Sequence, residues 1–157
     1  MLASTSMQLL LDFAYLTKLR QTEILNIERK NITDAGILVF ISKNNRYDMI
    51  EWTDALRDNV NAAIQLASNS LYLFPNQKSE RYTSDGFKAN WQRLIKKAEN
   101  LGVIDQRFTF HDIRAMAVTY TANKEGIEAA SLAAGHSSTT ITKRVYVRSI
   151  QKRKPTQ

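Results

Sequence analysis

The sequence predicts a mainly α-helical domain that contains one small, three-stranded antiparallel β-sheet. Apolar residues recur at helical spacing through most of the chain, whereas residues 37–41 and 47–52 are short runs rich in β-branched and aromatic residues. The polar residues between the two runs include Asn44-Asn45, which tolerate positive φ. We therefore expect a β-hairpin with Lys43 at its tip, and a short first strand over 31–33.

The helices are expected to begin at residues that can cap them and to end near glycine or polar turns. The expected starts are Ser4 or Ser6, Thr22, Thr53 or Asp54, and Ser84. A helix over 112–122 and short helices over 128–134 and near 140–144 follow. From these elements we expect one domain over 1–150 and a basic, flexible tail over 151–157.

Composition narrows the possible classes of protein. The chain has 157 residues, of which 43% are hydrophobic, enough for a buried core. It has no Cys, so a disulfide framework or thiolate metal site is excluded and an intracellular, cytoplasmic protein is the simplest expectation. The first residues have no basic region before the apolar ones and predict neither a signal peptide nor a membrane span.

The net charge of +7 is concentrated near the C-terminus. No acidic residue follows Glu128, and this part of the chain contains six positive residues: Lys143, Arg144, Arg148, Lys152, Arg153 and Lys154. A basic end on an otherwise balanced domain favours a polyanionic partner, above all nucleic acid, over a merely solvated tail.

Several polar residues stand in settings that suit a phosphate site. Arg20 follows an apolar helix, and Arg114 lies among apolar residues on the predicted 112–122 helix, three positions after His111. Guanidinium groups bind phosphate oxygens and stay charged. Each arginine alone fits a salt bridge better, to Glu23 or to Asp112. With two histidines and no cysteine, a metal site is not expected.

Taken in order, these residues resemble the motifs of the tyrosine recombinases, the phage integrase family. LTKLRQTEIL, which contains Arg20, is similar to the first arginine box, and FTFHDIRAMAVT is similar to the HxxR box. AAGHSSTTITKRVYVR resembles the box in which a histidine, here His136, precedes the nucleophilic tyrosine, here Tyr146. Lys43 corresponds to the lysine of the family's β-hairpin. The resemblance implies the integrase catalytic-domain fold over nearly the whole chain.

Three features depart from the family pattern. Lys18 and Thr22 stand where glycine, and glycine or serine, are common. The interval from His136 to Tyr146 is one residue longer than usual, which places Val145 at the usual register of the nucleophile. Family members also begin a helix earlier, after an N-terminal DNA-clamping domain. We therefore expect this chain to be a C-terminal catalytic fragment that is monomeric alone, whereas full-length relatives form homo-tetramers on DNA.

The resemblance implies site-specific recombination of double-stranded DNA at attachment-type sites, as in integration or excision of a phage or mobile element. Tyr146 would attack a phosphodiester and form a 3′-phosphotyrosine, without a metal ion or cofactor. Arg20, Arg114 and His136 would bind the phosphate, and Lys43 would protonate the leaving oxygen. His111 would hydrogen-bond the phosphate or move the tyrosine's proton. Glu23 would orient another member of this set.

Other interpretations of the same sequence stay open. The chain could be a non-catalytic, DNA-binding remnant of an integrase, which the longer interval before Tyr146 favours. It could be a protein-interaction domain whose basic end confers solubility, or a type IB topoisomerase, which shares the same chemistry. Formation of a covalent DNA adduct, salt-dependent DNA binding and relaxation of supercoiled DNA distinguish these possibilities.

Overall fold

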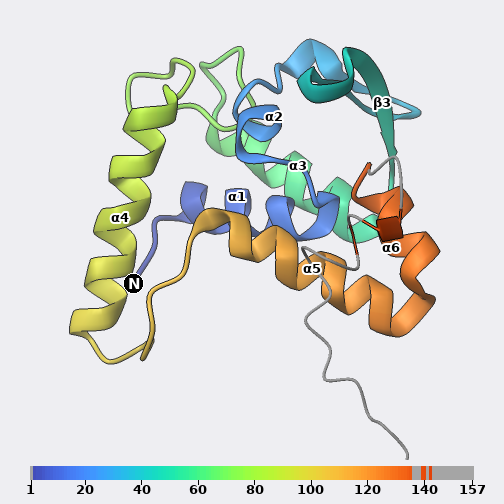
Figure 1. The fold of residues 1–157 in the computed structure, drawn as a ribbon. Helices are drawn as coiled ribbons and strands as arrows, with labels where there is room; N and C mark the ends of the chain where they lie inside the picture. The colour runs from blue at the N-terminus through green and yellow to red at the C-terminus, as the bar shows by residue number, and fades with distance from the viewer. Residues whose placement is uncertain (1, 136–138, 141, 143–157) are drawn as a thin grey trace, which may run out of the picture.

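The structure, a computed structural model, describes residues 2–135, 139, 140 and 142. Within them there are six α-helices and one small sheet, which lies at one edge of the helical part (Figure 1). The helices are α1 (Thr5–Thr17), α2 (Gln21–Leu25), α3 (Asp54–Leu66), α4 (Ser84–Asn100), α5 (Phe110–Glu125) and α6 (Ile127–Ala133). The strands are β1 (Ile32–Thr33), β2 (Gly36–Ile41) and β3 (Arg46–Glu51), with 3₁₀ turns η1 (Arg29–Asn31) and η2 (Ser42–Asn44). The predicted mainly helical fold with a three-stranded antiparallel sheet is confirmed.

Helix α1 lies at the centre of the core and contacts both α3 and α5 (Figure 1). Ser4 caps it by accepting a hydrogen bond from the Met7 N–H at 3.3 Å. Its inward side chains Leu10 and Phe13 are fully buried, and Phe13 meets Phe74 edge to face with ring centroids 5.1 Å apart. Burial of such side chains provides the main stabilisation of the fold.

Helix α4 joins this core through an aromatic cluster. Phe87 contacts Phe110 with ring centroids 5.0 Å apart, and Trp91 contacts Phe110 at 5.6 Å. Phe110 is the first residue of α5. The cluster therefore fixes the start of α5, where His111 and Arg114 lie, against the rest of the domain.

The sheet is the expected hairpin with one short added strand, in the order β1-β2-β3. Ile37, Val39 and Ile41 alternate toward the core, and the opposite face of β2 and β3 is exposed. The register pairs Phe40 with Tyr47 across the hairpin. The turn consists of η2, which contains Lys43, and of Asn45, which takes φ 48° as its residue type allows.

Three helix starts differ from the sequence prediction. Helix α2 is capped at Arg20 rather than Thr22, because the Glu23 carboxylate accepts the Arg20 main-chain N–H at 2.7 Å. Helix α5 begins at Phe110 rather than at 112, because Asp112 accepts hydrogen bonds from the Thr109 N–H and hydroxyl. Helix α6 begins one residue before the predicted 128, at Ile127.

The remaining predictions fall on short or peripheral segments. Thr53, rather than Asp54, caps α3, and helix α4 begins at Ser84 as expected. Thr139, Thr140 and Thr142 are helical, whereas the rest of the helix predicted near 140–144 and the predicted tail lie outside the described residues. No helix in the described residues is long and apolar enough to cross a membrane.

Lys18 is the residue at which the chain turns from α1 toward α2. It has φ 57°, in the left-handed region, and its N–H donates to the Ala14 carbonyl to close α1. A side chain in this region crowds its own carbonyl, and glycine avoids that cost. The glycine that the resemblance led us to expect at this position would therefore relieve a local conformational cost.

We expect Lys18→Gly to raise the free energy of unfolding by about 1 kcal/mol, and the melting temperature by about 2–4 °C. The matched control is Lys18→Ala, which removes the same side-chain contacts but keeps the strained φ. The difference in stability between the two variants, measured by thermal and urea unfolding, gives the free-energy cost of a non-glycine residue in this left-handed backbone conformation. Equal stability of the two variants would contradict this account.

Candidate functional site

Arg20, His111 and Arg114 surround one pocket of about 270 Å³. Arg20 and its neighbours Gln21 and Thr22 form one wall at the start of α2, and the first turn of α5 forms the other. Residues separated by about ninety positions in the chain are thus brought together, as the predicted phosphate site requires. The pocket is positive, and His111, which forms part of its wall, is exposed to solvent.

Arg114 is buried at 3% exposure, and main-chain carbonyls hold its guanidinium. One terminal nitrogen donates to the Lys18 carbonyl, and the other donates to the Ala134 carbonyl at 2.6 Å. These carbonyls lie at the C-terminal ends of α1 and α6, where the helix dipoles place partial negative charge. One side chain of the HxxR box therefore joins the first arginine box to the segment that leads to Gly135-His136.

Arg20 is held by a carboxylate. Its Nη1 lies 2.9 Å from Oε1 of Glu23, whose side chain is only 2% exposed, while the Arg20 side chain is 27% exposed. The salt bridge to Glu23 that the sequence allowed for Arg20 is therefore present. It fixes the guanidinium at the pocket wall and leaves part of it exposed to an incoming anion.

Partial burial, together with two neighbouring cations, lowers the pKa of His111. The pKa falls below 6.5 mainly through partial burial, then through the positive charges of Arg114 and Arg20, while Asp112 opposes the change. The imidazole is therefore neutral at pH 7 and able to accept a proton. A phosphate in the pocket would reverse the electrostatic part of this shift.

Lys43 lies apart from this pocket. It is exposed in η2 at the hairpin tip, as expected, and does not line the cavity. The same hairpin nevertheless lies close to the end of α6: a Cβ built on Gly135 would be 3.7 Å from Oδ2 of Asp48 in β3. The end of α6 therefore contacts the hairpin on one side and Arg114 on the other.

Two predicted site residues, His136 and Tyr146, lie outside the described residues. The described part of the chain contains no group of three or more His, Asp or Glu side chains able to hold a metal ion. The two carbonyls that hold Arg114 were missed by sequence reasoning, because no residue type marks a main-chain acceptor.

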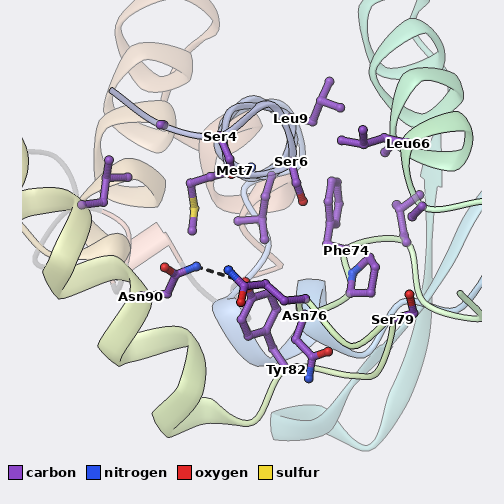
Figure 2. Close-up of a pocket in the computed structure, with 18 of the residues that line it drawn as sticks. Ser4, Ser6, Met7, Leu9, Leu66, Phe74, Asn76, Ser79, Tyr82 and Asn90 are labelled. Atoms are coloured by element: carbon purple, nitrogen blue, oxygen red, sulfur yellow. Dashed lines mark hydrogen bonds between the residues drawn. The ribbon is translucent and has the colours of Figure 1, made fainter. Parts of the chain in front are cut away.

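A larger cavity lies elsewhere. About 560 Å³ in volume, it lies between the start of α1, the loop before α4 and α4 itself, and is lined by none of the predicted site residues that the structure describes (Figure 2). Figure 2 shows Phe74 and Tyr82 among its walls, with the Tyr82 hydroxyl accepting a hydrogen bond from the Asn90 amide at 3.0 Å. The titratable residues that line it are Tyr82, Arg93 and Lys97.

Residues 2–153 match the sequence profile of the phage integrase family, and the chain belongs to that family. Its fold is similar to that of lambda integrase in a dimer bound to a COC′ core site, with TM-score 0.76 and 18% identity over 95% of this chain and 56% of that one. For the lambda integrase catalytic core, the TM-score is 0.69 and the sequence identity is 16%, with 83% of each chain covered. For XerA recombinase, the TM-score is 0.70 and the sequence identity is 18%, over 94% of this chain and 60% of that one.

At these identities the structural likeness establishes the fold. The chain spans about half the length of the DNA-bound lambda integrase chains, 56% of one and 46% of another. No curated protein sequence matches it. The resemblance to tyrosine recombinases and the catalytic-domain fold inferred from the sequence are confirmed.

We expect Arg114→Lys to lower the free energy of unfolding by about 1–3 kcal/mol, because a single ammonium cannot serve both helix-terminal carbonyls and leaves a buried acceptor unpaired. Urea unfolding measures the loss. The control is Arg107→Lys, at an exposed ion pair with Glu99, which should leave the midpoint nearly unchanged. An equally small effect at Arg114 would show that the carbonyl contacts do not join the two helices.

We expect the His111 pKa to lie below 6.5 in an NMR titration, with the signal assigned by its loss in His111→Gln. The folded state then binds fewer protons than the unfolded state. The contribution of His111 to the free energy of unfolding is complete above pH 6.5 and is lost as the pH falls through the folded-state pKa. Relative to His111→Gln, the wild type should therefore lose stability on acidification. A His111 pKa above 6.5 would contradict the proximity of the two arginines.

Proposed function

We propose that this chain is the catalytic part of a site-specific DNA recombinase that cuts and rejoins strands through a tyrosine. The supporting observation is the convergence of Arg20, His111 and Arg114 on one positive pocket in a phage integrase fold. The proposed substrate is double-stranded DNA, and the basic residues near the C-terminus would add phosphate contacts independent of sequence.

In the proposed reaction the Tyr146 oxygen attacks a phosphodiester. The tyrosine loses its proton, an O–P bond forms to give a 3′-phosphotyrosine, and the bond to the 5′-oxygen breaks. Attack by the 5′-hydroxyl of another strand reverses these steps and restores a diester, so bond energy is conserved and no nucleotide cofactor is consumed.

The pocket suits the charge that develops in this reaction. A diester carries one negative charge, and the transition state places more on the nonbridging oxygens, which Arg20 and Arg114 would stabilise. Both guanidinium groups are held in advance, by Glu23 and by two carbonyls, so little reorganisation is needed. Cations held in fixed positions stabilise the transition state better than freely moving cations would.

The remaining roles concern proton transfer and further binding. Neutral His111 can accept the tyrosine's proton or donate a hydrogen bond to the phosphate. Lys43, on the exposed hairpin turn, would protonate the departing 5′-oxygen once DNA lies against the hairpin. His136 would donate another hydrogen bond to the phosphate. Assembly of four chains on two sites would belong to the full-length protein.

We expect Tyr146→Phe to abolish a covalent protein–DNA adduct and to leave DNA affinity within about twofold, because one hydroxyl adds little to binding that phosphate contacts dominate. The duplex would be selected by the chain from a random library and then nicked beside the cleavage position. Denaturing gels detect the adduct, which should also form in EDTA. The control Tyr120→Phe alters an exposed tyrosine of α5 and should retain the adduct.

An adduct that persists in Tyr146→Phe would show that another residue is the nucleophile. A strict need for Mg²⁺ would indicate a nuclease-type site. Salt-dependent DNA binding by the wild type without any adduct would instead identify a DNA-binding remnant.

A further inference from the structure

A second pocket, of about 220 Å³, is lined by α2 and adjoins the pocket that contains Arg20, His111 and Arg114. Its walls are α2, the η1 turn and the exposed face of the β2–β3 hairpin. Thr22 lines both this pocket and the one that contains Arg20, His111 and Arg114. The two cavities therefore meet at a single residue.

The hairpin wall of this second pocket is aromatic. Phe40 and Tyr47 face each other across the two strands with ring centroids 5.2 Å apart, and they are 44% and 62% exposed. Leu38 lies on the same outer face and also lines the pocket. Exposed aromatic pairs of this kind provide surfaces on which a flat ligand can stack.

Part of the helical wall of this pocket consists of neutral polar side chains. The Asn26 side-chain oxygen accepts from Arg81 at 2.9 Å, and the Asn31 side-chain oxygen accepts from the Glu28 N–H at 2.9 Å. Among the described residues, neither amide nitrogen has a hydrogen-bond acceptor, so both amides retain N–H donors. The hydroxyls of Thr22 and Ser42 also line the cavity.

These features fit one nucleobase. The volume is below the roughly 300–1,000 Å³ of pockets that take drug-sized ligands. A base offers flat faces to Phe40 and Tyr47, and acceptor atoms on its edges to the asparagine amides. Lys30, which also lines the pocket, is paired with Glu28 at 2.7 Å, so this pair does not make the cavity a second phosphate site.

We propose that this pocket holds one unstacked base of the nucleotide whose phosphate occupies the neighbouring site. The inference rests on the proposed function. Rejoining to a different strand requires the base beside the cut to leave its complement, and an aromatic pocket would offset part of the lost stacking. The shared wall at Thr22 places the base pocket beside the phosphate pocket, as a single nucleotide requires.

The test compares thymidine 3′,5′-bisphosphate with 2-deoxyribose 3,5-bisphosphate, which lacks the base, by NMR on the full chain. Both compounds should shift the His111 imidazole signals, and only the thymidine compound should shift the Tyr47 ring. The thymidine compound should also bind roughly tenfold more tightly, the effect expected of one stacked base.

Tyr47→Ala should remove this affinity difference, and because Tyr47 is 62% exposed, the substitution should leave the fold intact. The control Met49→Ala alters an exposed residue of the same strand that does not line the pocket, and should keep the difference. Equal binding of the two compounds, with His111 shifted by both and Tyr47 by neither, would overturn the base pocket alone. A failure of both compounds to shift His111 would overturn the phosphate site on which it depends.

Discussion

The arrangement of the site depends on the contacts of the Arg114 guanidinium with two main-chain carbonyls. Because Lys18 ends α1 and Ala134 follows α6, a single side chain of α5 joins two helix ends that are distant in sequence. Arg20 comes two residues after the first carbonyl and Gly135 one residue after the second. The positions of the start of α2 and of the end of α6 therefore depend on one buried cation.

Bringing cations together without a bound anion is costly, and the structure reduces that cost in three ways. Glu23 neutralises part of the charge of Arg20, and the negative ends of α1 and α6 face Arg114. His111 responds by a lowered pKa and stays neutral, which removes a third positive charge. These contacts let the two arginines lie at one pocket. In the proposed reaction a phosphate would add negative charge beside them.

Much of the fold could be predicted because local signals agreed with the tertiary structure. Leu10 and Phe13 occur at helical spacing and lie in the hydrophobic core, and Asn45 has the positive φ that asparagine tolerates. The prediction failed at Thr22 because the cap comes from Glu23, a carboxylate inside the helix that reaches back to the Arg20 N–H. A search for Ser or Thr before an apolar run does not detect a cap whose accepting side chain lies inside the helix.

The site was predictable in its residue types and less so in its geometry. The resemblance supplied Arg20, His111 and Arg114 as a set, and the structure brings these three to one pocket. The salt bridge to Glu23 was foreseen as an alternative to anion binding, but the two are compatible, since Arg20 stays partly exposed. The carbonyl partners of Arg114 could not be foreseen, because every residue has a carbonyl and only the fold selects which ones converge.

The five-residue helix α2 shows how stability and function are combined in one short element. A helix of this length is not stable alone, since forming its first turn costs more than its few hydrogen bonds return. The Glu23 carboxylate caps it by accepting the Arg20 main-chain N–H and also pairs with the Arg20 guanidinium, and burial of Ile24 and Leu25 fixes it to the core. The same pair holds the phosphate-side wall, while the following residues form the wall of the aromatic pocket. Replacing Arg20 by any residue except proline would keep the main-chain N–H that Glu23 accepts, but would leave the buried Glu23 carboxylate without its guanidinium partner.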